Sequence, residues 1–225
     1  DGIRDDLVTG VQTCALPIST VPWPPGVTLQ GQSVRLEPLS MAHANDLKEA
    51  TRDGQLWKLW YTSVPSPEAM DAEIERRLGL HRDGSMLPFA VISQMRGLHP
   101  DRAIGMTTFM NIDRSNRRVE IGSTWYRKSV QRTPLNTEAK KLLLTYAFDT
   151  LDCIAVEFRT HWMNHQSRRG IERLGAKLDG VLRSHQINRH PDAQGSLRDT
   201  CVYSIVASEW SAVKAHLNHQ LSSRQ

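Results

Sequence analysis

The sequence contains no apolar run that approaches the roughly 20 residues needed for a membrane-spanning helix. Its longest apolar stretch is short and lies around Leu142–Leu144. The hydrophobic content of 39% and the charged content of 23% are ordinary for a globular protein. A chain of 225 residues is long enough for one sizeable core with tails. We therefore expect a single globular domain.

Cysteine is scarce and forms no metal-binding pattern. The three cysteines, Cys14, Cys153 and Cys201, lie far apart, and no CxxC or Cys/His spacing typical of zinc occurs. An odd number of separated thiols favours a reduced, cytoplasmic setting without a metal. Cys153 and Cys201 fall in apolar, strand-like runs, which predicts that both are buried.

Charge of one sign is not concentrated anywhere in the sequence. The net charge is +4, and the densest basic cluster, Arg168, Arg169 and Arg173, also contains Glu172. A nucleic-acid-binding protein usually shows a concentrated basic stripe with interleaved aromatic residues. The small excess of positive charge is spread along the chain, and it fits a protein that binds a polyanionic small ligand and a protein with a solvated surface equally well.

The N-terminal segment lacks the features of a secretory signal. Three aspartates surround the single cation Arg4, and Gln12 interrupts the apolar run. The string VTGVQTCALPI, residues 8–18, resembles the translation of a common sequencing adapter. We therefore expect residues 1–19 to be a non-native segment that packs poorly and lies outside the fold.

Alternating strand and helix patterns follow a proline-rich extended leader over residues 20–33. Strands are predicted over 33–39, 87–93, 103–111, 118–126, 154–160, 176–185 and 200–206. Helices are predicted over 40–53, 66–82, 133–151, 164–174 and 209–221. This order predicts a mixed α/β domain over 34–207 with a C-terminal helix and tail over 208–225. We expect a mostly antiparallel sheet of six to seven strands, about four flanking helices and one βαβ crossover.

The crossover is the most informative unit for function. A polar loop follows the strand at 118–126, and Thr133 and Pro134 suit the first positions of the next helix. Unpaired N–H groups and the helix dipole at such a start favour a phosphate. Arg127, Lys128 and Arg132 add positive charge. Most helix starts bind only water or their caps, so the geometry alone is compatible with either a phosphate site or an ordinary capped helix start.

A set of short motifs, in a fixed order along the chain, adds to the evidence from the crossover. The motifs are VEIG at 119–122, WY at 125–126, QRTPLNTEAK at 131–140, NHQS at 164–167, ERLGA at 172–176, GVLR at 180–183, RD at 198–199 and YS at 203–204. From about residue 34 to 206 the chain resembles the GNAT (Gcn5-related N-acetyltransferase) superfamily, nearest the branch that acetylates ribosomal-protein N-termini. The resemblance implies the GNAT fold, in which two central parallel strands splay apart around acetyl-CoA.

The resemblance also implies a reaction. Acetyl would pass directly from acetyl-CoA, as co-substrate, to a primary amine of a protein N-terminus or a small molecule, with no acyl-enzyme and no metal. Many relatives pair as homodimers, and we expect neither a membrane nor a nucleic acid as partner. Two other readings stay open: a GNAT-like CoA-binding domain without turnover, and a ribosome- or RNA-associated module.

The family's pyrophosphate loop is only partly matched. Gln131 fits its first position, but Pro134 replaces a glycine and Asn136 replaces a small residue. Proline removes an N–H donor, so we expect weakened rather than abolished binding, with substitute side-chain donors from Thr133, Asn136 and Thr137. The cofactor-binding residues implied by the resemblance are Trp125, Tyr126, Arg127, Gln131, Arg132, Thr133, Asn136, Thr137 and Asn164.

Direct transfer needs a base for the ammonium proton and an acid for the leaving thiolate. Glu120 is our candidate base, acting through water; the alternative is an exposed carboxylate paired with Arg118 or Arg159. Glu157 on the next strand is a weaker rival. These carboxylates lie on the two strands that the resemblance places beside the gap.

Ser167 is implied by the resemblance as the acid or hydrogen-bond partner of the thiolate. It also fits a local role, because Asn164 followed by Ser167 is a helix-capping arrangement. The two readings are compatible.

Aromatic and histidine side chains are the remaining candidates. Trp57, Trp60 and Tyr61 either wall an acceptor pocket or pack in the core, and core packing is the commoner role. The histidines around the expected site match no metal pattern, although one of them could contact substrate; they are His161, His165, His185 and His190.

Overall fold

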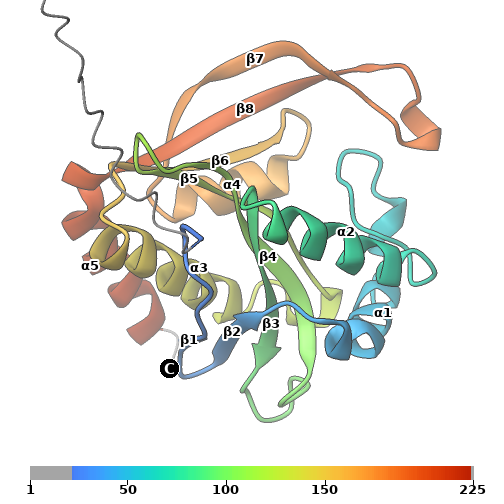
Figure 1. Ribbon diagram of the computed structural model, residues 1–225, viewed down its shortest axis with the longest axis horizontal. Coiled ribbons are helices and arrows are strands. Elements are labelled where there is room, and N and C mark those ends of the chain that lie inside the picture. Colours follow the sequence, from blue (N-terminus) through green and yellow to red (C-terminus); the bar gives the residue numbers. More distant parts are fainter. Residues whose placement is uncertain (1–21, 224–225) are drawn as a thin grey trace, which may run out of the picture.

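A computed structural model describes residues 22–223 and shows a mixed sheet with helices on both faces (Figure 1). The predicted adapter-derived segment, residues 1–19, lies outside the described residues. The strands are β1 (Leu29–Gln30), β2 (Val34–Pro38), β3 (Met86–Ser93), β4 (Ala103–Asp113), β5 (Arg118–Tyr126), β6 (Ala155–His161), β7 (Lys177–Ile187) and β8 (Leu197–Val206). The helices are α1 (Ala44–Arg52), α2 (Met70–Arg82), α3 (Leu135–Thr145), α4 (His165–Arg173) and α5 (Trp210–Ser222).

The strands form one sheet in the order β1-β2-β3-β4-β5-β6-β8-β7. Only β5 and β6 run parallel, and α3 connects them as the expected crossover. The described residues contain eight strands, one more than the highest predicted number, because Leu29 and Gln30 in the leader pair with β2. The mostly antiparallel mixed α/β architecture is therefore as predicted.

Two hydrophobic clusters hold the sheet between its helices. Leu135 and Leu143 of α3 and Leu217 of α5 belong to the larger cluster, and Leu47 and Ile74 of α1 and α2 belong to the smaller one. Figure 1 shows these two helix pairs on opposite sides. All eight residues of β3 are buried, which is typical of a strand covered on both faces.

The central feature of the sheet is the separation of β5 from β6. Their ladder contains three pairs and ends with Glu120 opposite Glu157. Beyond that point β5 continues to Tyr126 without a partner on this side. Its register with β4 shifts between Met106 and Thr108, and Ser123 has a φ of 48°. This bulge bends β5 away from β6, and the space between the two strands beyond their last pair is called the gap below.

The crossover helix is shorter than the predicted range of 133–151. It continues after Thr145 as a π turn over Tyr146–Thr150. Asp149 in this turn accepts hydrogen bonds from Trp210 Nε1 at 2.6 Å and from Lys214 Nζ at 2.5 Å. These contacts with α5 hold the wider turn, which the apolar periodicity alone does not distinguish from a regular helix.

The predicted burial of Cys153 and Cys201 is confirmed, and both thiols are free. Burial raises the pKa of the Cys153 thiol to about 11. Over residues 22–223, no helix combines the length and the apolar character required to cross a membrane.

Candidate active site

Glu120 lies at the last paired position before the two parallel strands separate. Its side chain is buried, at 5% exposure, so the alternative of an exposed carboxylate is wrong about exposure, although the pairing with Arg159 that it included is present. Asn111 Nδ2 donates to Glu120 Oε2 at 2.6 Å, and Arg159 Nε lies 3.5 Å from the same oxygen. Burial raises the pKa of Glu120, although Asn111 and Arg159 act in the opposite direction. A carboxylate with a raised pKa is suited to taking up a proton.

Glu157, directly across the ladder, has a different environment. Arg118 Nη2 lies 2.5 Å from Glu157 Oε1, and Arg159 Nη2 lies 2.9 Å from its Oε2. Although burial raises it, these two arginines hold the pKa of Glu157 below its usual value. Glu157 is therefore the poorer base.

The start of α3 has free hydrogen-bond donors. The Glu138 N–H donates to the Pro134 carbonyl at 3.0 Å, and Thr133 Oγ1 accepts from the Leu135 N–H at 3.4 Å. No contact of the described residues uses the N–H groups of Asn136 and Thr137. Helix starts with such N–H groups suit an anion. The helix begins at Leu135, one residue later than predicted, with Pro134 as its N-cap.

Gln131 joins three elements beside the gap. Its Nε2 donates to the Tyr126 carbonyl at the end of β5 at 2.9 Å, and its Oε1 accepts from Gln166 Nε2 of α4 at 3.2 Å. The side chains of Trp125 and Tyr126 are buried in the two opposite clusters. These residues therefore offer backbone rather than side-chain groups at the gap.

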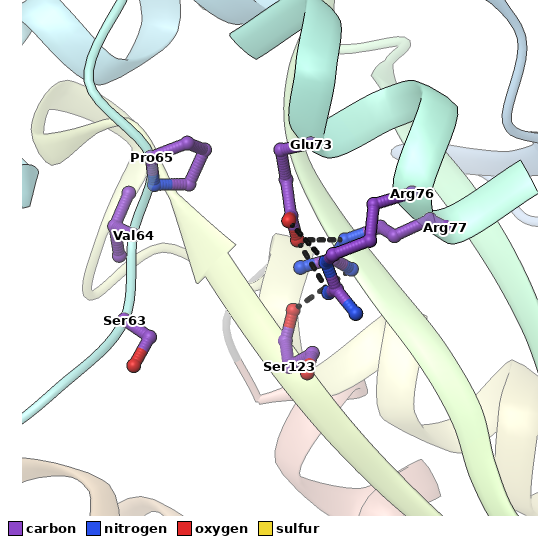
Figure 2. A pocket seen from close by; sticks show the side chains of 7 residues that line it. All are labelled: Ser63, Val64, Pro65, Glu73, Arg76, Arg77 and Ser123. Atoms are coloured by element: carbon purple, nitrogen blue, oxygen red, sulfur yellow. Dashed lines mark hydrogen bonds and ion pairs between the residues drawn. The ribbon is translucent and has the colours of Figure 1, made fainter. Parts of the chain in front are cut away.

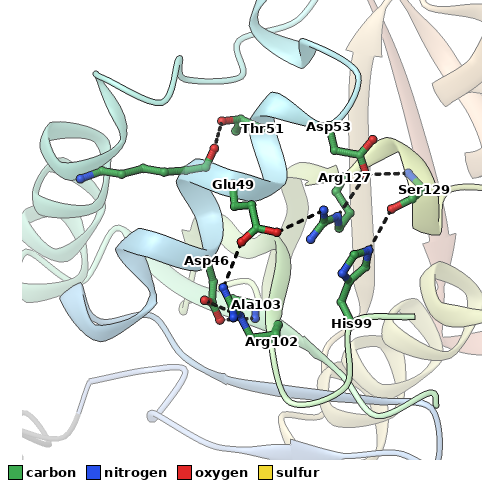
Figure 3. Close-up of polar contacts among 10 residues, drawn as sticks. Asp46, Glu49, Thr51, Asp53, His99, Arg102, Ala103, Arg127 and Ser129 are labelled. Carbon is green, nitrogen blue, oxygen red and sulfur yellow. Dashed lines mark hydrogen bonds and ion pairs between the residues drawn. The ribbon is translucent and has the colours of Figure 1, made fainter. Parts of the chain in front are cut away.

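Arg127 does not supply mobile charge to the loop, contrary to our expectation. Its Nε lies 3.1 Å from Asp53 Oδ2 and its Nη2 lies 3.6 Å from Glu49 Oε1 (Figure 3). These carboxylates of α1 and its C-cap hold the guanidinium, which is buried. Lys128 and Arg132 remain exposed.

Asn164 caps α4 as expected. Its Oδ1 accepts from the backbone N–H of Ser167 at 3.0 Å. The Ser167 hydroxyl takes no part in this cap, so it is available for another partner. Both sequence-based readings of Ser167 thus remain compatible.

A cavity of about 670 Å³ contains the predicted aromatic residues. Trp57, Trp60 and Tyr61 line it and belong to neither hydrophobic cluster. His161 forms an edge contact with Trp60 at 5.1 Å between ring centroids, and its Nδ1 accepts from a backbone N–H. Arg198 also lines the cavity; burial lowers its pKa while Glu120 acts in the opposite direction. Arg198 thus links the cavity electrostatically to Glu120, which is not itself one of the lining residues.

A second cavity, of about 350 Å³, lies between α2 and the bulge of β5 (Figure 2). Arg77, at 1% exposure, forms an ion pair with Glu73 at 2.7 Å. It also donates to Thr108 Oγ1 at 2.9 Å and to the Ser123 carbonyl at 3.5 Å. Sequence reasoning missed this residue, because a helix segment rich in Arg and Glu is typical of a solvated face.

The other candidate histidines have partners other than Glu120, and His190 also lines the aromatic cavity. His185 Nδ1 is 3.1 Å from Thr200 Oγ1, and His190 Nε2 is 3.4 Å from the Trp57 carbonyl. His165 begins α4. Within residues 22–223, no group of three or more His, Cys, Asp or Glu side chains is arranged to hold a metal ion.

Comparisons with known proteins identify the family. Residues 33–177 match the model of the acetyltransferase (GNAT) domain. Over 117 residues the chain is 31% identical to the "Putative ribosomal N-acetyltransferase YdaF" of Bacillus subtilis (strain 168), covering 52% of this chain and 61% of that protein. Over 186 residues it is 24% identical to the uncharacterized N-acetyltransferase p20 of Bacillus licheniformis, covering 82% and 98%.

A solved structure agrees with the fold. The GCN5-related N-acetyltransferase from Brucella melitensis superposes with a TM-score of 0.77 at 29% identity, covering 91% of this chain and 92% of that one. The chain belongs to the GNAT family of acetyltransferases and is an acyltransferase, with a resemblance to the ribosomal-protein branch.

Proposed function

We propose that this protein transfers an acetyl group from acetyl-CoA directly to a primary amine, with Glu120 as the base. The observation that carries the proposal is the position of Glu120. It is a buried carboxylate with a raised pKa, next to the point where β5 and β6 separate. A donor can enter the gap from the α3 side, and an acceptor can enter from the aromatic cavity.

The start of α3 supports a donor that carries phosphate. The N–H groups of Asn136 and Thr137 lack partners among the described contacts, and Arg132 is exposed nearby. Asn136 Oδ1 is a buried acceptor without a partner, so the support for a phosphate comes from the backbone N–H groups and not from this oxygen. We assign the pyrophosphate to residues 131–137 and the pantetheine arm to the backbone at 124–127 and to Asn164.

The chemistry follows from these assignments. The ammonium form of the acceptor loses a proton to Glu120 through water, and the lone pair of the neutral amine then attacks the thioester carbon. A C–N bond forms, the C–S bond breaks, and the thiolate leaves. The extra proton on the new amide nitrogen passes to the thiolate, so that the products are the amide and CoA thiol. The Ser167 hydroxyl, which the α4 cap does not use, donates to that thiolate.

The aromatic cavity supports an acceptor with an extended chain. Its volume is that of a small ligand or the end of a peptide, and its walls combine aromatic rings with Arg198. One relative is named as a ribosomal N-acetyltransferase. We therefore favour a peptide N-terminus over a small amine. The two free buried cysteines support a reducing, cytoplasmic setting, and a homodimer stays a prediction.

The proposal is tested by incubating the protein with acetyl-CoA and a panel of peptides and small amines. Mass spectrometry should show one added acetyl group on the amine of at least one acceptor, and Glu120→Gln should abolish it. Binding of acetyl-CoA without transfer to any acceptor would favour the non-catalytic reading. Salt-sensitive RNA binding without transfer would favour the RNA-associated reading.

A further inference from the structure

Lys140 of α3 is a buried cation that the proposed reaction does not use. Its side chain is 6% exposed, and its Nζ donates to Thr107 Oγ1 of β4 at 3.1 Å and to Thr124 Oγ1 of β5 at 2.7 Å. The two hydroxyl oxygens are themselves 2.8 Å apart. The three groups thus form a closed triangle beneath the bulge of β5.

Among residues 22–223, no carboxylate forms an ion pair with Lys140. Burial is the cause that lowers the pKa of Lys140, to about 7. Charged groups on the adjoining elements are engaged elsewhere. Glu138 of α3 accepts from the backbone N–H groups of residues 32 and 33. Arg173 of α4 donates to Thr137, and Arg35 of β2 pairs with a glutamate of its own strand. Lys214 of α5 pairs with Asp149 of the π turn.

The geometry determines where each hydroxyl hydrogen points. While Lys140 is protonated it has only donors, so Thr107 and Thr124 both accept from it. Either hydroxyl can donate in the contact between Thr107 and Thr124. Thr107 is fully buried, and its described contacts offer no other acceptor, so we assign its hydrogen to Thr124 Oγ1. Both lone pairs of that oxygen are then filled. The hydrogen of Thr124 has only the Gly122 carbonyl as an internal partner, at 3.3 Å. This contact is longer than an ordinary O–H···O hydrogen bond, so a ligand acceptor at normal distance can draw the Thr124 hydrogen outward.

Thr124 lies on the part of β5 that has left β6. It is four positions beyond Glu120, the last paired residue, and it is half-buried. One edge of β5 pairs with β4, and Lys140 of α3 contacts the Thr124 side chain. The edge of β5 that no longer pairs with β6 is therefore the side from which a ligand can approach Thr124. A neutral Lys140 amine has a lone pair and can accept the Thr124 hydrogen, which would turn the hydroxyl inward.

We infer that Lys140 and Thr124 form a protonation-dependent switch, in which protonated Lys140 directs the Thr124 hydroxyl outward to an acceptor oxygen of the acyl-CoA thioester arm. Lys140 acts through Thr124 and is a positioning residue. The inference rests on the proposed function. It predicts that the affinity for acetyl-CoA falls as pH rises through the ionisation of Lys140.

The test measures the dissociation constant of acetyl-CoA by calorimetry at about pH 6 and about pH 8.5, on either side of the Lys140 ionisation. One lost hydrogen bond should weaken binding about three- to tenfold at the higher pH. The ligand phosphates also titrate, so the comparison is with variants. Lys140→Met and Thr124→Val should remove the step, while Thr124→Ser and the neighbouring control Lys141→Met should keep it. An NMR titration of the Lys140 side chain without ligand should show its ionisation at the same pH.

The outcomes separate the two proposals. If the unmodified protein binds acetyl-CoA and Lys140→Met keeps the same pH dependence, the switch is overturned and the proposed function stands. If Thr124→Val binds like the unmodified protein at both pH values, the switch is also overturned. If no acetyl-CoA binds at any pH, the proposed function fails and the switch fails with it.

Discussion

Glu120 and Glu157 face each other across the last rung of the parallel ladder between β5 and β6, yet their pKa values shift in opposite directions. Burial dominates at Glu120 and raises its pKa. Arg118 and Arg159 lower the pKa of Glu157 despite its burial. Two carboxylates whose environments separate their pKa values in this way can divide the roles of base and structural ion pair.

Substitution of the two glutamates should separate activity from stability. The folded state raises the pKa of Glu120. Its contribution to stability is therefore present at pH values below its pKa in the unfolded chain, and it is lost as the pH rises through its pKa in the folded protein. Glu120→Gln should therefore not lower the melting temperature at neutral pH. The folded state lowers the pKa of Glu157, so this carboxylate stabilises the fold at pH values above its pKa in the unfolded chain. Glu157→Gln should therefore lower the free energy of unfolding at neutral pH by up to about 1 kcal/mol.

Thermal melting at neutral and acidic pH checks this prediction. The loss in Glu157→Gln should disappear as the pH falls through the folded-state pKa of Glu157. A larger destabilisation in Glu120→Gln than in Glu157→Gln at neutral pH would show that Glu120 is mainly a structural partner of Arg159.

Substitutions of Ser167 and Asn164 should also separate an effect on catalysis from an effect on stability. The α4 cap uses the Asn164 side chain and only the backbone of Ser167. Ser167→Ala should therefore lower kcat while leaving the melting temperature unchanged. Asn164→Ala should cost about 1 kcal/mol of stability. Calorimetric melting together with thiol-release kinetics checks both, and unchanged kcat in Ser167→Ala would remove it from the mechanism.

Pro134→Gly should tighten the binding of CoA. Proline withholds one N–H from the first turn of α3, and glycine would supply it. A hydrogen bond to a charged phosphate outweighs the added backbone flexibility of about 0.5–1 kcal/mol, so we expect roughly threefold or stronger binding by calorimetry. Unchanged or weaker binding would contradict this account of the loop.

Lys140→Met should stabilise the protein. The lowered pKa means that the folded state pays the full cost of burying the charge below about pH 7. This cost shrinks as pH rises toward the unfolded pKa of lysine. The gain in unfolding free energy should thus be larger at about pH 6 than at about pH 9. Urea denaturation measures it, with Lys141→Met as the control. An equal gain at both pH values would contradict the burial of a charged amine.

The strand and helix order could be predicted because periodicity and caps recur along the chain. The gap between β5 and β6 was implied by the resemblance to the GNAT superfamily, whereas the crossover itself predicted only that the two strands are parallel. Glu120 could be named as a candidate, but its burial depends on Asn111, which lies nine residues away on the adjacent strand. Sequence patterns do not reveal such a partner.

The burial of Lys140 and Arg77 could not be predicted either, because it also depends on partners that are distant in the sequence. Lys140 occurs in the charged string EAKK and Arg77 in EIERR, and both resemble solvated helix faces. Their burial is set by Thr107 and Thr108, neighbours on β4 that contact Lys140 and Arg77 respectively. Arg127 was expected to be mobile, but Asp53 at the end of α1 holds it.

The most direct measurement of the central claim is the pH dependence of kcat/KM for acetyl transfer, for the unmodified protein and for Glu120→Gln. Because the base must be ionised, kcat/KM should rise with pH through a pKa above 4.5, the ordinary value for a glutamate. Glu120→Gln should lose this rise and about 10² to 10⁴ of the rate. A variant that keeps both the rate and the acidic limb of the unmodified protein would contradict the assignment of Glu120 as the base.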